Sequence, residues 1–66
     1  MSKTEMFEVY IKCSGKTKTY LARKAGISLP TLYRLIDHPE KCTFDLATFF
    51  KRELALSDDQ MNIFLP

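Results

Sequence analysis

The feature that most constrains this chain is a glycine, Gly26, that separates two short stretches of helical periodicity within residues 17–37. Before it, Leu21, Ala22 and Ala25 fall at i, i+1 and i+4, which predicts one apolar helix face. A glycine directly after the last periodic residue can adopt the left-handed conformation that ends a helix and turns the chain. The pattern therefore predicts two short helices joined by a tight corner.

The second stretch carries its own start signal and its own apolar face. Ser28 is a suitable N-cap, and Pro30 falls in the first turn, where a helix does not need its missing N–H group. Leu32, Leu35 and Ile36 then repeat at i, i+3 and i+4, which predicts a buried face. The opposite face is expected to carry four residues: Leu29, Tyr33, Arg34 and Asp37.

Several constrained positions agree along this segment, namely Leu21, Ala22, Ala25, Gly26, Ile27, Ser28, Leu32 and Leu35. Their spacing resembles the helix-turn-helix signature of the Cro and phage-repressor family, and the match covers about a third of the chain. That signature has a small residue four positions before the glycine, an Ile or Val after it, and two aliphatic residues in the second helix. Helices that cross at a steep angle need a small residue where they approach, which is Ala22 in this chain.

The flanking segments also show helical patterns. Ser2 and Glu5 form a capping-box pattern for an apolar first helix over about residues 3–14. Thr43 is expected to cap a fourth helix, and residues 56–60 to open a short final one. The inner side of the fourth helix is expected to carry Leu46, Phe49, Phe50 and Leu54. We therefore predict an all-α protein, a compact bundle of about five short helices around a central helix-turn-helix, similar to lambda-repressor-like domains.

Length and composition favour one small globular domain over residues 1–66. With 45% hydrophobic and 27% charged residues, the chain has the composition of a folded domain. A chain this short buries only about 60% of the surface that its unfolded form exposes, so modest stability is expected. No apolar run approaches the ~20 residues of a membrane helix, and the N-terminus lacks a signal-peptide pattern. We expect a soluble, cytoplasmic protein.

Charge is distributed unevenly along the chain, whose net charge is +2. Residues 1–36 contain seven Lys or Arg and two Glu, a balance of +5. Residues 37–66 contain three Lys or Arg and six acidic residues, a balance of −3. Because positive charge gathers in and before the predicted helix-turn-helix, the pattern favours a polyanionic partner. The alternative is a solvated surface whose charges balance across the fold.

The family resemblance implies that the second helix of the motif lies in the DNA major groove while the first crosses the backbone. When the family's DNA-facing positions are transferred to this sequence, they fall on Ser28, Leu29, Thr31, Tyr33, Arg34 and Asp37. Thr31 is at the edge of this face. Arg34 is the expected base reader, because a guanidinium can donate to both O6 and N7 of guanine, although it can equally bind a phosphate. Leu29 is expected to touch a thymine methyl group, and Tyr33 a methyl group or a phosphate.

Thr17, Lys18 and Thr19 stand at the start of the motif's first helix, where hydroxyls and free N–H groups suit a phosphate. Lys18 replaces the glutamine of many family members, and the second helix has no Asn or Gln for adenine. Specificity then has to rest on Arg34, apolar contacts and DNA shape. Asp37 is acidic on this face and has the i, i+3 spacing for an ion pair with Arg34. Weaker candidates for backbone contacts are Lys16, Arg23, Lys24 and Lys41.

The sequence predicts no metal site, cofactor or catalytic activity. Cys13 and Cys42 lack metal-ligand spacing, and the single histidine, His38, is expected to help neutralise the carbonyls that end its helix. Both cysteines are expected to be partly buried apolar residues, with a disulfide between them as the alternative. No catalytic arrangement of Ser, His, Asp, Cys or paired carboxylates is visible, so we expect neither an enzyme nor a small-molecule ligand.

Two functions fit these patterns. The first is a sequence-specific transcriptional regulator, a Cro-like repressor of a phage or prophage, that binds double-stranded operator DNA as a homodimer. The second is a protein-interaction module of the same fold, an antirepressor or antitoxin, that uses its apolar first or last helix.

The apolar C-terminus leaves its own two alternatives open. In the first, the segment folds back onto the core through Met61 and Phe64, or through Leu65. In the second, the segment forms a dimer surface together with Phe50 or Leu54.

Overall fold

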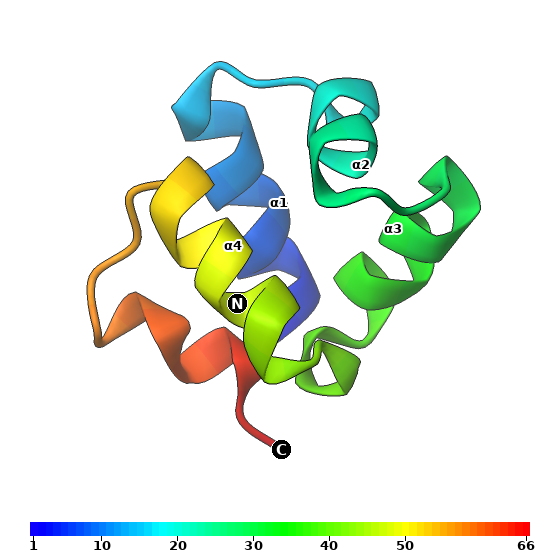
Figure 1. Cartoon of the computed structure of the whole chain (residues 1–66). Helices are drawn as coiled ribbons and strands as arrows, with labels where there is room; N and C mark the ends of the chain where they lie inside the picture. The colour runs from blue at the N-terminus through cyan, green and yellow to red at the C-terminus, as the bar shows by residue number, and fades with distance from the viewer.

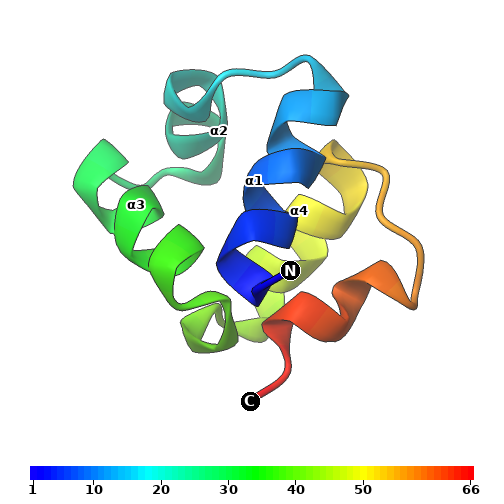
Figure 2. The same cartoon turned by 180° about the vertical axis from the view of Figure 1, so that it is seen from behind.

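The computed structural model describes residues 1–66, and all of its regular structure is helical. The elements are α1 (Lys3–Ser14), α2 (Lys18–Ala25), α3 (Leu29–Asp37), the 3₁₀-helix η1 (Pro39–Lys41), α4 (Phe44–Glu53) and the 3₁₀-helix η2 (Gln60–Phe64). Helices α2 and α3 lie on one side of α1 and α4, and η2 lies on the other (Figures 1 and 2). The all-α prediction is confirmed, with the expected fifth helix present as a 3₁₀-helix. None of the helices combines the length and apolar character of a membrane span.

Local sequence signals set the starts of the helices. The side chains of Thr17, Ser28 and Thr43 each accept a hydrogen bond from the N–H three residues later, at 3.0, 3.2 and 3.2 Å. At the start of α1, the Glu5 N–H donates to Ser2 Oγ at 3.1 Å and the Ser2 N–H donates to Glu5 Oε1 at 3.0 Å. These caps satisfy N–H groups that have no partner within their helix, and they confirm the predicted starts.

The corner between α2 and α3 is closed by backbone hydrogen bonds around a left-handed glycine. Gly26 has φ +76°. Its N–H donates to the Arg23 carbonyl at 3.2 Å, and the N–H of Ile27 donates to the Ala22 carbonyl at 3.0 Å. This pair of bonds uses carbonyls that the end of a helix leaves free. The chain therefore passes from α2 to α3 through only three residues.

The core is a single apolar cluster with contributions from α1, α2, α3, α4 and the C-terminal segment. The fully buried rings of Phe7 and Phe50 meet edge to face, with centroids 5.1 Å apart, and Phe64 lies 5.4 Å from Phe7. The other members are Ile11, Leu21, Ala22, Leu32, Ile36, Ala47, Leu54, Leu56 and Ile63. On α4, Leu46 and Phe49 pack against this cluster as predicted. Large aromatic side chains supply much of the apolar area that so short a chain can bury.

The C-terminal segment folds back onto this core. Ile63 and Phe64 are buried, Met61 packs partly against the cluster, and Leu65 remains 57% exposed. The fold-back interpretation is therefore confirmed. Phe50 and Leu54 are buried within the chain and cannot contribute to the dimer surface considered as the alternative.

The two cysteines have different environments, and both thiols are free. Cys42 is half-buried, which raises the pKa of its thiol to about 11, and the nearby Glu40 carboxylate adds to this rise. Cys13 is exposed on α1, next to a face where Val9 is also 40% exposed. The prediction of partial burial is correct for Cys42 and wrong for Cys13, because this part of α1 lines an open groove.

Candidate nucleic-acid interface

The candidate interface centres on α3, whose inner side is fixed by three buried residues, Leu32, Leu35 and Ile36. Burial of one apolar face leaves the opposite face to solvent. On that face Arg34 and Asp37 are exposed, and Tyr33 is 48% exposed. The outward position predicted for these side chains agrees with the structure.

A row of hydrogen-bonded side chains runs along the exposed side of α3. Ser28 Oγ and Thr31 Oγ1 lie 2.8 Å apart, and Arg34 Nη2 donates to Thr31 Oγ1 at 3.3 Å. A guanidinium has five N–H donors, so most of them stay available to a ligand. The predicted ion pair between Arg34 and Asp37 is wrong, since neither forms a salt bridge. Helical side chains lean toward the N-terminus, which brings Arg34 to the hydroxyl one turn earlier.

Leu29 differs from the other predicted contacts because it packs partly against the core cluster and is only half-exposed. At the other end of α3, Thr4 Oγ1 on α1 lies 2.9 Å from the Ile36 carbonyl oxygen and 3.1 Å from that of Asp37. The His38 ring instead lies beside Glu40, at 3.6 Å. The carbonyl-neutralising role predicted for His38 is thus filled by Thr4, a contact that the sequence alone did not reveal.

The start of α2 lies beside this surface. Thr17 and Thr19 are exposed, and the Thr17 hydroxyl accepts from the Tyr20 N–H. Lys18 Nζ lies 2.8 and 3.0 Å from the two carboxylate oxygens of Glu8 on α1. The same ammonium group is 5.4 Å from the centre of the Tyr33 ring on α3, within the range of a cation–π contact. Lys18 therefore connects α1, α2 and α3.

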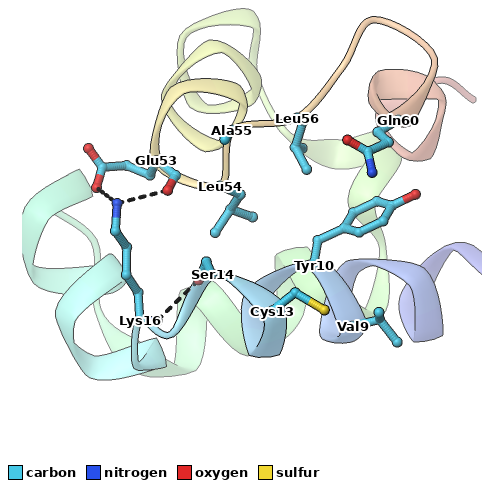
Figure 3. A pocket seen from close by; sticks show the side chains of 10 residues that line it. All are labelled: Val9, Tyr10, Cys13, Ser14, Lys16, Glu53, Leu54, Ala55, Leu56 and Gln60. Atoms are coloured by element: carbon cyan, nitrogen blue, oxygen red, sulfur yellow. Dashed lines mark hydrogen bonds and ion pairs between the residues drawn. The ribbon is translucent and has the colours of Figure 1, made fainter.

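A second acidic residue, Glu53 at the end of α4, binds one lysine before α2 and one near the end of α2. Lys16 Nζ donates to the Glu53 carboxylate at 3.0 Å and to its backbone carbonyl at 2.8 Å (Figure 3). Lys24 Nζ lies 3.5 Å from the other carboxylate oxygen and 3.1 Å from Tyr20 Oη. The hydrogen bond from Lys16, together with the charges of Lys16 and Lys24, holds the pKa of Glu53 below its ordinary value. Two of the weaker candidates for DNA backbone contacts are therefore already paired.

The other two weaker candidates, Arg23 and Lys41, are exposed and form no salt bridge.

Elsewhere, an open groove of about 490 Å³ runs between the second half of α1 and the chain after α4 (Figure 3). Its lining residues are Val9, Tyr10, Cys13, Ser14, Lys16, Glu53, Leu54, Ala55, Leu56 and Gln60. Of the residues considered for DNA contacts, only Lys16, one of the weaker candidates, lines this groove.

The structure thus brings most of the predicted residues into two groups. Ser28, Thr31 and Arg34 form the row on α3, while Lys18 reaches Tyr33 across the interface between α2 and α3. Comparisons with family models, curated proteins and solved structures give no match to this chain.

Proposed function

We propose that this protein is a sequence-specific DNA-binding transcriptional regulator, a Cro-like repressor in which α2 and α3 act as a helix-turn-helix. The observation that carries the proposal is the hydrogen-bonded row of Ser28, Thr31 and Arg34, which leads from the N-cap of α3 along the flank of the helix to its exposed face. Support also comes from the corner at Gly26, through which a second helix follows the first after only three residues.

In this proposal α3 enters the major groove and Arg34 reads a guanine through two of its N–H donors. The bond from Arg34 to Thr31 holds the guanidinium along the helix, so less side-chain freedom is lost on binding. Tyr33 contacts a methyl group or a phosphate beside the groove. At the start of α2, the N–H groups of Lys18 and Thr19 have no acceptor within the helix and suit a phosphate oxygen.

The proposed regulator acts as a homodimer on a partly palindromic operator of phage or prophage type. One motif of this size contacts too little DNA to be selective, and two copies can read two half-sites about one helical turn apart. Among the exposed apolar side chains, Phe44 at 84% and Leu65 at 57% support a contact between copies.

The test is a gel shift with the DNA upstream of the protein's own gene, compared with a mixed-sequence duplex. We expect Arg34→Ala to reduce the ratio of affinities for the specific and the mixed-sequence duplex by about five- to 150-fold. This range corresponds to the roughly 1–3 kcal/mol of a bidentate guanine contact. Arg52→Ala is the matched control, since Arg52 is exposed on α4 and forms no salt bridge. Binding that does not depend on salt, or an Arg34→Ala variant that behaves like the wild type, would contradict the proposal.

A second candidate function is a protein-interaction module of the same fold that acts on another regulator. It is favoured by the pairing of Lys16, Lys18 and Lys24 with carboxylates, which reduces the positive charge offered by α2 and the residues before it. It is also favoured by the unpaired Asp37 on α3. Co-purification of one phage or chromosomal repressor, with no DNA retained, would favour this function over the first.

A further inference from the structure

The ammonium group of Lys18 is occupied by a carboxylate of the same chain. Both oxygens of Glu8 lie within 3.0 Å of Lys18 Nζ, at the edge of the candidate interface where Lys18 also approaches Tyr33. The side chains of Lys18 and Glu8 are 31% and 45% exposed, so a larger anion in solution can reach the pair. Glu8 therefore offers Lys18 what a DNA phosphate offers, two oxygens that carry negative charge.

We propose that Glu8 is an intramolecular competitor of the DNA phosphate for Lys18 and thereby limits the DNA affinity of this protein. This inference rests on the proposed function, because it concerns the same surface. A phosphate that binds Lys18 must first displace Glu8. One ion pair is then exchanged for another, so the contact contributes little to the free energy of DNA binding. The displaced carboxylate then stays beside the phosphate, within the roughly 8 Å over which charges interact at physiological salt.

Competition of this kind has a distinct effect on salt dependence. A lysine that neutralises a phosphate releases counterions from DNA, and each such contact steepens the dependence of binding on salt concentration. When Glu8 neutralises Lys18 in advance, that contribution is reduced. Removal of the Glu8 charge should therefore change both the affinity and its salt slope, whereas a purely structural role would leave the slope unchanged.

The experiment measures binding of Glu8→Gln to a short mixed-sequence DNA duplex by fluorescence anisotropy over a series of NaCl concentrations. We expect binding at low salt to tighten about 1.5- to fivefold, the range that corresponds to an exposed ion pair. The slope of log affinity against log salt should steepen by about 0.9, the increment for one further phosphate contact. Glu8→Ala should give the same changes, which guards against an effect peculiar to glutamine.

Two controls change the net charge by the same amount elsewhere. Asp58→Asn also breaks an ion pair, the one with Lys51 on α4, and Asp59→Asn removes a carboxylate that forms no salt bridge. Both should leave the slope closer to that of the wild type. In a Lys18→Gln background, Glu8→Gln should lose most of its effect on the slope.

Failure of the proposed function and failure of the Glu8 competition give different results in this experiment. Wild-type protein that binds no DNA in a salt-dependent way overturns both this inference and the proposed function. Wild-type protein that binds while Glu8→Gln is unchanged overturns the competition alone. Equal gains in Glu8→Gln, Asp58→Asn and Asp59→Asn also overturn it, because net charge would then account for the effect.

Discussion

Ala55 holds a left-handed backbone conformation, with φ 52°, at the turn that follows α4. Its own N–H donates to the Arg52 carbonyl at 3.4 Å, and the N–H of Leu56 donates to the Lys51 carbonyl at 2.9 Å. Helices that end with this pair of bonds usually have glycine at this position. The left-handed conformation costs an L-residue about 1–2 kcal/mol of strain, which glycine avoids. Glycine also makes the unfolded chain more flexible, and this offsets about 0.4–1 kcal/mol of the gain. We expect Ala55→Gly to raise the free energy of unfolding by about 0.5–1 kcal/mol, measured with urea.

The reverse substitution provides the control for Ala55→Gly. Gly15 ends α1 with φ +75°, and a Cβ atom built on it would meet no atom within 4 Å. Gly15→Ala should therefore destabilise the protein through backbone strain without any clash. If Ala55→Gly and Gly15→Ala change stability in the same direction, left-handed strain does not explain either position.

The two thiols should react at very different rates. The thiolate is the reactive form, so the raised pKa of Cys42, about 11, leaves almost none of it at pH 8, whereas Cys13 is exposed. We expect a thiol reagent such as DTNB to label one cysteine quickly, and Cys13→Ser to abolish that fast phase. Two equally fast thiols would contradict the burial of Cys42.

The same pKa shift predicts a loss of stability in alkali. The folded protein keeps the Cys42 proton above the ordinary pKa of 9.0, where the unfolded chain releases it. Because the unfolded state then binds fewer protons, this residue lowers the free energy of unfolding as the pH rises from 9.0 toward 11. Cys42→Ser should show a smaller loss over that range.

At the scale of the helices, the ends could be predicted because each depends on residues close in sequence. Thr17, Ser28 and Thr43 cap the helix that begins at the next residue, and Gly26 ends the helix just before it. The final helix was less predictable. Residues 56–60 carry a capping pattern that is present in the structure, with Ser57 and Gln60 joined by reciprocal hydrogen bonds of 2.8 and 3.2 Å, yet the helix that follows is of 3₁₀ type. A pattern of caps does not distinguish the two helix types.

The candidate interface was predictable in its positions and less so in its electrostatics. The apolar spacing of α3 identifies its outward face, but it does not show which carboxylate reaches which lysine. Glu8 is ten residues from Lys18, and Glu53 is 37 residues from Lys16. Such pairs depend on how the helices pack, and no local spacing rule describes them. Only pairs three or four residues apart on one helix follow such a rule, and even the pair expected of Arg34 did not form.

The packing of α2 within the helical cluster gives a test at the scale of this element. Ala22 is 4% exposed and belongs to the core cluster, so larger side chains have no free space there. We expect Ala22→Leu to lower the free energy of unfolding by about 1–3 kcal/mol, the usual cost of overpacking. Thr48→Leu is the control, because it also introduces a larger apolar side chain into a helix, but at an exposed position of α4. It should change the free energy of unfolding by no more than about 0.5 kcal/mol. Equal effects in urea unfolding would contradict the predicted close packing at Ala22.

At the scale of the whole molecule, the fold redistributes the charge that the sequence places in its first half. Lys16 and Lys24 come from the basic half, and both pair with Glu53 from the acidic half. Lys18 pairs with Glu8 inside the basic half. The excess of +5 therefore overstates the positive charge that the surface of α2 and α3 presents. Arg23 and Arg34 are the exposed cations of these two helices that form no ion pair, so they are the ones expected to dominate attraction to a polyanion.

The stability of the whole molecule depends on the aromatic cluster that joins α1 to α4 and to η2. A 66-residue domain has a free energy of unfolding of about 3–10 kcal/mol. Replacement of a buried phenylalanine by alanine costs about 3–5 kcal/mol, which is a large part of that total. We expect Phe7→Ala to leave the protein largely unfolded or with a strongly reduced midpoint in thermal circular dichroism. Phe44→Ala makes the same change at a side chain that is 84% exposed, and it should shift the midpoint little. A Phe7→Ala variant that melts like Phe44→Ala would show that the contact of Phe7 with Phe50 and Phe64 does not hold the bundle together.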